Sequence, residues 1–529
     1  MNIIMSSPQA NPLLHLLLQQ LEAAEHRNHQ IRSRNEHGTI IQVPGTGKAI
    51  SSAYEQLRNA AEYTEEHLLL QRAIRRFYHR NLSFFSHKSP GNIGEELVVE
   101  LTQAGYLQNH SVSHETAATI LHLTNEYMHA YWQMRDSHVS REDAMEWTLA
   151  ILSVETEEML NPHAQLAALA QFGYQHYLQL FPRTTFIVDN EDHENYEISL
   201  YIAVHLALLK SDISVVRHDL MRMYNQSPAN LPAFVAFNKT ITELYTSKLT
   251  GRLKRAVMKY GAPLRVLKSM VDDHANLTEV LKNREIFLAE YQQQVNNEYR
   301  DVKRRLNKGI IKSIIFIFIT KVIIGIGIEV PYDLIVHHMV ALVPLAINLL
   351  FPPAYMALLW LGLKVPSQAN AQALAQYIDK TLYSHELPVI PHLRDANKRS
   401  SLGAKFLYTL LFFVPFALTV YILWLLHFNI VQAIIFFVFF STASFLGFRL
   451  SRLVRELEIV TKQNGFLSSV RDFFYLPFIV VGQWLSSKYA KINAVAYVLD
   501  IAIEMPLKTV LRLLRQWTRF LNEKHEDIY

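Results

Sequence analysis

A glycine-rich turn near the amino terminus contains the first residues that could do chemistry. The stretch VPGTGKA contains Gly45, Gly47 and Lys48 in the order found at the end of a phosphate-binding loop. In such a loop, backbone amides surround the phosphates, the lysine reaches the terminal phosphates and a hydroxyl holds magnesium. Here Gln42 replaces the first glycine of the pattern, and Ala49 replaces the hydroxyl. Nucleotide binding is therefore one hypothesis, and a plain glycine turn before a helix is the more common explanation.

A second candidate is a set of metal-ligand residues at helical spacing. His122, Glu126 and His129 stand at positions i, i+4 and i+7, so they share one face of a predicted helix. Carboxylate-bridged metal bundles use the same Glu-x-x-His spacing, but they need a second such motif and two more inward glutamates. Further carboxylates are present at Glu155, Glu157 and Glu158, without a second motif. A metal site is the hypothesis here, and a solvated polar face is the usual alternative.

Basic residues with interleaved aromatics form the third candidate, and its arginines are Arg72, Arg75, Arg76 and Arg80. Such a run can bind an acidic protein, RNA or anionic lipid headgroups. Because the same chain contains long apolar segments, we favour lipid or acidic protein over nucleic acid. A solvated helix face is the alternative explanation.

The fourth candidate lies in the most apolar part of the chain and comprises Lys321, Glu329, Asp333, His337 and His338. Ionisable side chains are costly in such surroundings, so a buried ammonium is expected to face the inside of a helix bundle and to find a partner. A structural ion pair and a transport role are both consistent with this pattern. The third possibility is that the lysine reaches back to the membrane surface.

Composition excludes several classes of site. The chain of 529 residues contains no cysteine, which rules out disulfides, thiol nucleophiles and cysteine metal centres. Any metal would need histidine and carboxylate ligands, and the chain has 24 histidines. The formal net charge of +4 does not argue for nucleic acid, because basic residues gather beside the apolar segments. No cofactor and no nucleic-acid partner are predicted.

The elements that must position these residues are helices, and we expect an all-α protein. Residues 1–262 predict a multi-helix cytoplasmic domain, with helix starts at Ser113 and Ser140, whose hydroxyls suit the N-cap position. Residues 263–309 predict one long charged connecting helix. A polytopic α-helical membrane domain is expected over residues 310–449, followed by a tail.

The membrane domain is predicted from runs of about twenty apolar residues, which are too long for an ordinary core helix. The four predicted spans are residues 311–330, 334–363, 406–426 and 430–448. A short corner at residues 329–333 is expected to join the first two spans. The second contains Pro344, Pro352 and Pro353, which predicts either one kinked span or a span followed by a re-entrant piece.

Orientation is predicted from basic residues, which favour the cytoplasmic side of a span. Those before the first span are Arg300, Lys303, Arg304, Arg305, Lys308 and Lys312. Arg449, Arg452 and Arg455 follow the last span, and the predicted external loops contain no Lys or Arg. We therefore expect both termini in the cytoplasm and a location in the plasma (inner) membrane. The amino terminus lacks the basic and apolar regions of a signal peptide, so no cleaved signal is expected.

The tail, residues 450–529, is predicted to be an interfacial amphipathic helical segment. Its charges recur every four residues at Asp500, Glu504, Lys508 and Arg512, which places them on one helix face. Such a helix packs on a membrane surface or under the spans. Its two acids are also candidate partners for Lys321.

The sequence predicts an architecture more readily than an activity. Our first hypothesis is a non-enzymatic, multi-pass membrane scaffold or regulator that contacts lipid and binds protein partners through its cytoplasmic domain. The second is an oligomeric transporter or channel that uses Lys321, His337 and His338. The third is a membrane enzyme that depends on a nucleotide at Lys48 or a metal at Glu126 and His129. A homo-oligomer is compatible with each of them.

Overall fold

The computed structural model describes residues 11–45, 48–62, 66–84, 91–162, 164–188, 190–273, 276–363, 365–384, 402–459 and 466–491. Helices dominate this part of the chain, which contains no β-strand and only an isolated bridge between Ile40 and Ser113. The predicted all-α class is confirmed for the described residues.

Fifteen α-helices and two short segments lead up to the long helix α16. They are α1 (Pro12–His37), α2 (Lys48–Glu62), η1 (Glu66–Leu68), α3 (Leu69–Phe84), α4 (Ile93–Ala104), α5 (His114–Asp136), α6 (Arg141–Leu160), α7 (Ala164–Leu180), α8 (Arg183–Phe186), α9 (Asn190–Glu194), α10 (Tyr196–Val204), η2 (His205–Leu209), α11 (Ile213–Met223), α12 (Leu231–Tyr245), α13 (Lys248–Tyr260), α14 (Ala262–Asp273) and α15 (Leu277–Lys282).

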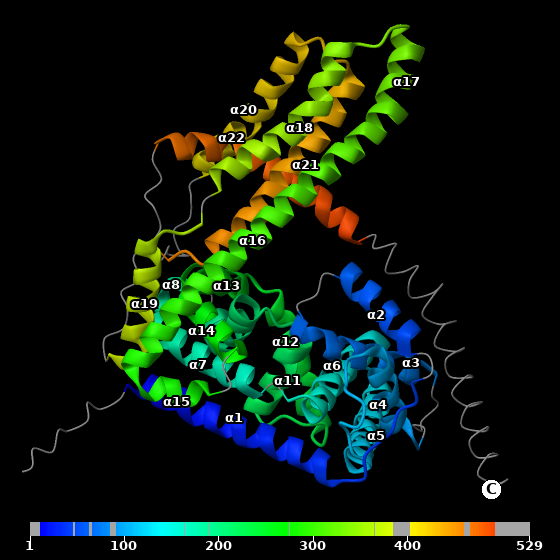
Figure 1. The fold of residues 1–529 in the computed structure, drawn as a ribbon, viewed down its shortest axis with the longest axis vertical. Coiled ribbons are helices and arrows are strands. Elements are labelled where there is room, and N and C mark those ends of the chain that lie inside the picture. The colour runs from blue at the N-terminus through cyan, green and yellow to red at the C-terminus, as the bar shows by residue number, and fades with distance from the viewer. Residues whose placement is uncertain are drawn as a thin grey trace, which may run out of the picture.

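The remaining elements are more apolar. They are α16 (Arg284–Ile324), η3 (Gly325–Glu329), α17 (Val330–Tyr332), η4 (Asp333–His337), α18 (Leu342–Gly362), α19 (Gln368–Tyr383), α20 (Leu402–Leu425), α21 (Ile430–Arg455) and α22 (Phe466–Lys491). Figure 1 shows α18, α20, α21 and α22 gathered at one end of the molecule, where they form what we call the apolar bundle together with the second half of α16.

The helix starts follow local chemistry. The side chain of Ser113 accepts a hydrogen bond from the backbone amide of Thr116, and that of Ser140 accepts one from Asp143. Each bond satisfies an amide that has no partner inside its own helix. Both predicted helix starts are confirmed.

One hydrophobic core contains residues of most of the helices from α1 to α15. We call the part of the molecule from α1 to α15, around this core, the helical body. The core also takes in the first turns of α16, through Phe287 and Tyr291, and two later segments. Those segments are α19, through residues such as Leu374 and Ile378, and the residues directly after α21, through Leu457. The core therefore does not end at residue 262, and residues from the predicted membrane domain help to close it.

The helix α16 joins the helical body to the apolar bundle (Figure 1). One face of its first half packs in the body's core, and its second half places Ile317 in a separate cluster with Met356 and Phe439. The predicted connecting helix was wrong at its start, because α14 (Ala262–Asp273) and α15 (Leu277–Lys282) precede α16 and contribute residues to the core of the body. The turn at Asn283 caps α16, since its side chain accepts from the amides of Glu285 and Ile286.

The predicted corner at residues 329–333 was also wrong. The helix continues through it as two π-helical segments, η3 and η4, and the chain turns only at His338, whose φ is 55°. Pro331 lacks the amide that an α-helix needs at that position, and wider π-type turns carry a helix past such a defect.

Within the described residues, three helices are long and apolar enough to cross a membrane: Arg284–Val336, Leu342–Gly362 and Ile430–Arg455. A shorter apolar stretch, Thr409–Leu425, lies within α20. The second predicted span, residues 334–363, is divided: its start belongs to η4, and α18, with 21 residues, forms most of the rest and contains Pro352 and Pro353. The helix α22 lies within the predicted interfacial tail and contains Pro477.

Close packing of α21 against α22 gives a first testable prediction. A Cβ atom placed on Gly482 would lie 2.2 Å from the backbone oxygen of Ser441 and 2.7 Å from the Cβ atom of Phe445. Gly482→Val should therefore force the two helices apart and destabilise the protein by about 1–3 kcal/mol. The measurement is the thermal unfolding midpoint in detergent. Gly362→Ala is the control, because no atom lies within 4 Å of a Cβ atom there, and equal midpoints for both variants would contradict the prediction.

Candidate functional site

Lys321 and Glu329 form a buried ion pair in the apolar bundle. Lys321 is 1% exposed and Glu329 is fully buried, and the lysine Nζ lies 2.9 Å from the glutamate Oε1. The same Nζ lies 4.6 Å from the ring centroid of Phe439, which adds a cation–π contact from α21. Eight residues of α-helix rise about 12 Å, so the two side chains must extend toward one another along the helix to meet.

The second oxygen of Glu329 is bound by a neighbouring helix. Asn348 of α18 donates from Nδ2 to Glu329 Oε2 at 2.9 Å and to the backbone oxygen of Gln432 at 3.2 Å. Asn348 is completely buried. Both oxygens of the carboxylate are therefore satisfied, which a charge in apolar surroundings requires.

Asp333 is the centre of the second half of the network. It accepts hydrogen bonds from Gln432 Nε2 at 2.9 Å, from Asn429 Nδ2 at 2.7 Å and from the backbone amide of Ala341 at 3.3 Å. Asn429 and Gln432 also form the capping box that starts α21. One carboxylate thus holds together the turn after η4 and the first turn of α21.

These contacts form a continuous polar network that links three apolar segments. It runs from Lys321 through Glu329 and Asn348 to Gln432, and on to Asp333 and Asn429. A buried ion pair of this kind adds little net stability, but removal of one partner leaves an uncompensated charge and costs roughly 3–5 kcal/mol. The geometry can fix the register of the three helices, and it can also hold protons or ions.

Other predicted residues of this group lie elsewhere. His338 is exposed at the turn after η4, away from the buried ion pair. The side chain of His337 is outside the described set, as is the predicted charge ladder of Asp500, Glu504, Lys508 and Arg512. Three residues of the network, Asn348, Asn429 and Gln432, had not been selected from the sequence. The sequence feature that could have identified them is a side-chain amide within or beside an apolar run.

The arginine run on α3 has partners inside the helical body. Arg75 Nη1 donates to Ser214 Oγ at 3.0 Å, and Arg76 Nη2 lies 2.6 Å from Glu55 Oε2. Arg80 pairs with Glu100. These contacts join α3 to α2, α4 and the first turn of α11. Arg72 is half-buried on the same helix.

The candidate phosphate loop lies before α2, and the candidate metal ligands lie on α5. Among the described residues, the structure does not place them in the polar network or in a shared site. The Lys48 amide donates to the Gly45 oxygen at 3.2 Å in a turn that leads into α2, and Gly47 lies outside the described residues. The trio of His122, Glu126 and His129 lies on the exposed face of α5. The glutamates Glu155, Glu157 and Glu158 lie on α6, where each of them lines a cavity of the helical body.

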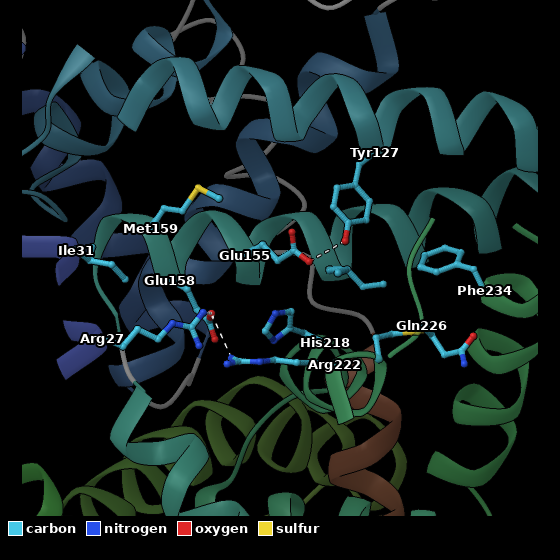
Figure 2. Close-up of a pocket in the computed structure, with 12 residues that line it drawn as sticks. Arg27, Ile31, Tyr127, Glu155, Glu158, Met159, His218, Arg222, Gln226 and Phe234 are labelled. Carbon is cyan, nitrogen blue, oxygen red and sulfur yellow. Dashed lines mark hydrogen bonds and ion pairs between the residues drawn. The ribbon is translucent and has the colours of Figure 1, made fainter. Parts of the chain in front are cut away.

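A cavity of about 310 Å³ in the helical body is lined by residues of α1, α5, α6, α11 and α12. Figure 2 shows Glu155, Glu158 and His218 around this cavity, with Arg27 and Arg222 beside Glu158. The Tyr127 hydroxyl donates to Glu155 Oε1 at 2.8 Å.

The surroundings shift the pKa values of two residues that line this cavity. Burial raises the pKa of Glu155 above its usual range, so the carboxyl more readily holds a proton. For His218, burial acts to lower the pKa, but the hydrogen bond to Asp219 and the nearby carboxylates outweigh it and raise the pKa. Neither His218 nor Asp219 had been selected from the sequence, because adjacent His and Asp residues on a helix are common.

Comparison with known protein families, curated proteins and solved structures gives no match for this chain.

Proposed function

We propose that this protein is a multi-pass membrane protein whose helical body acts as a cytoplasmic scaffold or regulator. In this proposal α16, α18, α20 and α21 cross the membrane, and both ends of the chain lie in the cytoplasm. The membrane is the plasma (inner) membrane. The body is held at the membrane surface, where it binds protein partners.

The observation that carries the proposal is the rigid attachment of the body to the bundle. Besides α16, the residues directly after α21 contact the body. Asn370 Nδ2 donates to the Leu457 oxygen at 2.7 Å, and Asn370 Oδ1 accepts from the Ile459 amide at 2.9 Å. Arg265 donates to the Glu456 oxygen at 2.6 Å. The body is therefore joined to the bundle twice, through α16 and through the residues after α21. These two connections fix the position of the body relative to the bundle, which a scaffold or a regulator requires.

The surfaces of the two parts support a membrane location. Large apolar side chains of the bundle point outward, among them Ile323 at 64%, Leu361 at 71% and Trp424 at 70% exposed. Surface of this kind is unfavourable in water and suits lipid. The basic residues of α16 follow directly after its buried first half, and exposed Lys303, Arg304 and Lys308 would lie beside anionic headgroups.

The absence of cysteine offers a direct test of orientation. Glu115→Cys places a single thiol on the exposed face of α5, and Ile430→Cys places one at the exposed start of α21. A membrane-impermeant maleimide should label Ile430→Cys in intact cells and Glu115→Cys only after permeabilisation. Labelling of Glu115→Cys in intact cells would overturn the proposed orientation.

The scaffold role is tested by purification from native membranes in mild detergent. A complex of fixed composition is expected, and it should survive in the double variant Lys321→Met/Glu329→Gln, because scaffolding does not need charge inside the bundle. A chain that purifies without any stoichiometric partner would contradict the scaffold role.

A transporter is the second candidate, and two observations favour it. Two ionisable residues of the network, Glu329 and Asp333, lie in π-helical segments, which are frequent at functional sites. Asn348 Oδ1 is buried and accepts no hydrogen bond within the described part of the protein. Proton or ion flux in reconstituted vesicles that is lost in Lys321→Met/Glu329→Gln would establish transport in place of scaffolding.

A further inference from the structure

Three potential metal ligands meet at one edge of the cavity in the helical body. Glu158 of α6 and His218 and Asp219 of α11 each offer a ligand atom, and these atoms lie within 4.8 Å of one another. Figure 2 shows Glu158 and His218 facing the same space. Ligand atoms about 2.1 Å from one ion lie roughly 3–4 Å apart, so small side-chain rotations would bring this set around a single ion.

The hydrogen bond between His218 and Asp219 has the spacing of two ligands on one ion, and a metal ion would replace the proton that it shares. His218 Nδ1 lies 3.0 Å from Asp219 Oδ1. Both residues are on the rigid helix α11, whose start is capped by Asp212, since its side chain accepts from the amides of Ser214 and Val215. The pair is therefore held in place before any ligand arrives.

A second histidine, His205, lies beside the carboxylate of Asp219. His205 is completely buried, and its Nε2 has no hydrogen-bond partner among the described residues. This nitrogen lies 3.6 Å from Asp219 Oδ2, beyond hydrogen-bond distance, while Nδ1 lies 3.3 Å from Ser211 Oγ. A buried imidazole nitrogen without a partner is costly. Its position beside the carboxylate indicates that something else completes the site.

A buried carboxylate oxygen lies next to this group. Glu157 is 6% exposed, and its Oε1 has no hydrogen-bond partner within the described residues. A cavity of about 60 Å³ is lined by Glu157, Glu158, His205 and Asp219. That volume is sufficient for an ion with a water ligand.

The arginines beside Glu158 leave part of it available. Arg27 Nη2 donates to Glu158 Oε2 at 2.7 Å, and Arg222 Nη1 lies 3.9 Å from the same oxygen. Both of these arginine contacts involve Oε2, so neither of them occupies Oε1. The guanidinium of Arg27 thus orients the carboxylate, as hydrogen-bonded neighbours of metal ligands do.

We propose that Glu158, His218 and Asp219 bind one divalent transition-metal ion. In this proposal His205 is a positioning residue that lies beside the Asp219 carboxylate. The donor set of one imidazole and two carboxylates suits Mn²⁺, Fe²⁺, Co²⁺ or Zn²⁺ better than Ca²⁺ or Mg²⁺, which prefer oxygen ligands alone. The ion joins α6 to α11 and fills the edge of the cavity. This inference does not depend on the proposed function, because the site lies wholly within the helical body.

The test uses the full chain in detergent, stripped of metal with a chelator and titrated with Co²⁺. One Co²⁺ per chain is expected, with a visible absorption band from nitrogen and oxygen ligands and a rise in the thermal unfolding midpoint. Glu158→Gln and His218→Gln should each weaken Co²⁺ binding by about 100-fold or more, and His205→Gln by roughly tenfold.

The matched control is His122→Gln/His129→Gln, which removes two exposed histidines from α5 and should leave Co²⁺ binding unchanged. Circular dichroism of each metal-free variant checks that it is folded. Failure of the wild-type chain to bind one Co²⁺ overturns the proposal. Unchanged binding in folded Glu158→Gln or His218→Gln also overturns it, and so does loss of binding in the α5 control.

Discussion

Lys321→Leu is expected to lower the amount of folded protein in membranes several-fold. The substitution leaves Glu329 buried without its cation, since Asn348 supplies only a neutral hydrogen bond to the other oxygen. The carboxyl must then either remain charged or take up a proton, and both are unfavourable. Breaking a buried pair in this way costs roughly 3–5 kcal/mol, which is a large share of the stability of a typical protein. The measurement is abundance in isolated membranes beside the wild type.

Two further variants separate the ion pair from a general effect of the substitution. Lys312→Leu changes an exposed lysine on the same helix and should leave abundance unchanged. The double variant Lys321→Met/Glu329→Gln removes both charges and should recover most of the loss, because Gln can still accept the hydrogen bond from Asn348. Wild-type abundance for Lys321→Leu alone would show that the pair is not structural.

Acid is expected to destabilise the helical body through His176. This side chain is completely buried between α7 and α19, where Nε2 lies 3.0 Å from the Tyr377 hydroxyl. Burial lowers the pKa of His176 from 6.5 to about 3. Between these two values the unfolded chain binds a proton that the folded chain does not. Stability from this residue is therefore fully present above pH 6.5 and falls by about 1.4 kcal/mol per pH unit as the pH drops toward 3.

The variant His176→Phe should remove this share of the acid sensitivity. Its unfolding free energy should fall less steeply between pH 6.5 and 4.5 than that of the wild type, with a difference in total loss of about 2–3 kcal/mol. The measurement is the unfolding free energy from denaturant titrations at several pH values. His129→Gln is the control, because that histidine is exposed on α5. Parallel pH profiles for wild type and His176→Phe would refute the assignment.

Local patterns in the sequence predicted local structure well. The caps at Ser113 and Ser140 depend on residues three positions away, so a short window contains all the necessary information. The apolar runs likewise indicated the helices that are long enough to cross a membrane. The corner at residues 329–333 was mispredicted because proline and charge in a short stretch resemble a turn, whereas the chain absorbs Pro331 by widening the helix.

The candidate sites depended on contacts between distant segments, and here sequence patterns were insufficient. Glu329 was among several possible partners of Lys321, but its contact with Asn348 requires the relative position of two helices. The metal-ligand set was sought on α5, where the spacing was favourable. The structure instead brings Glu158 of α6 to His218 of α11, and no spacing rule connects residues so far apart in the chain.

The participation of α19 in the core also constrains how the protein is synthesised. The ribosome makes α14 and the first half of α16 well before α19, and α18 lies between them in the chain. At ordinary translation rates this delay is on the order of ten seconds. During that time the apolar faces that later receive Leu374 and Ile378 are uncovered. The partly synthesised chain therefore exposes this apolar surface until α19 emerges.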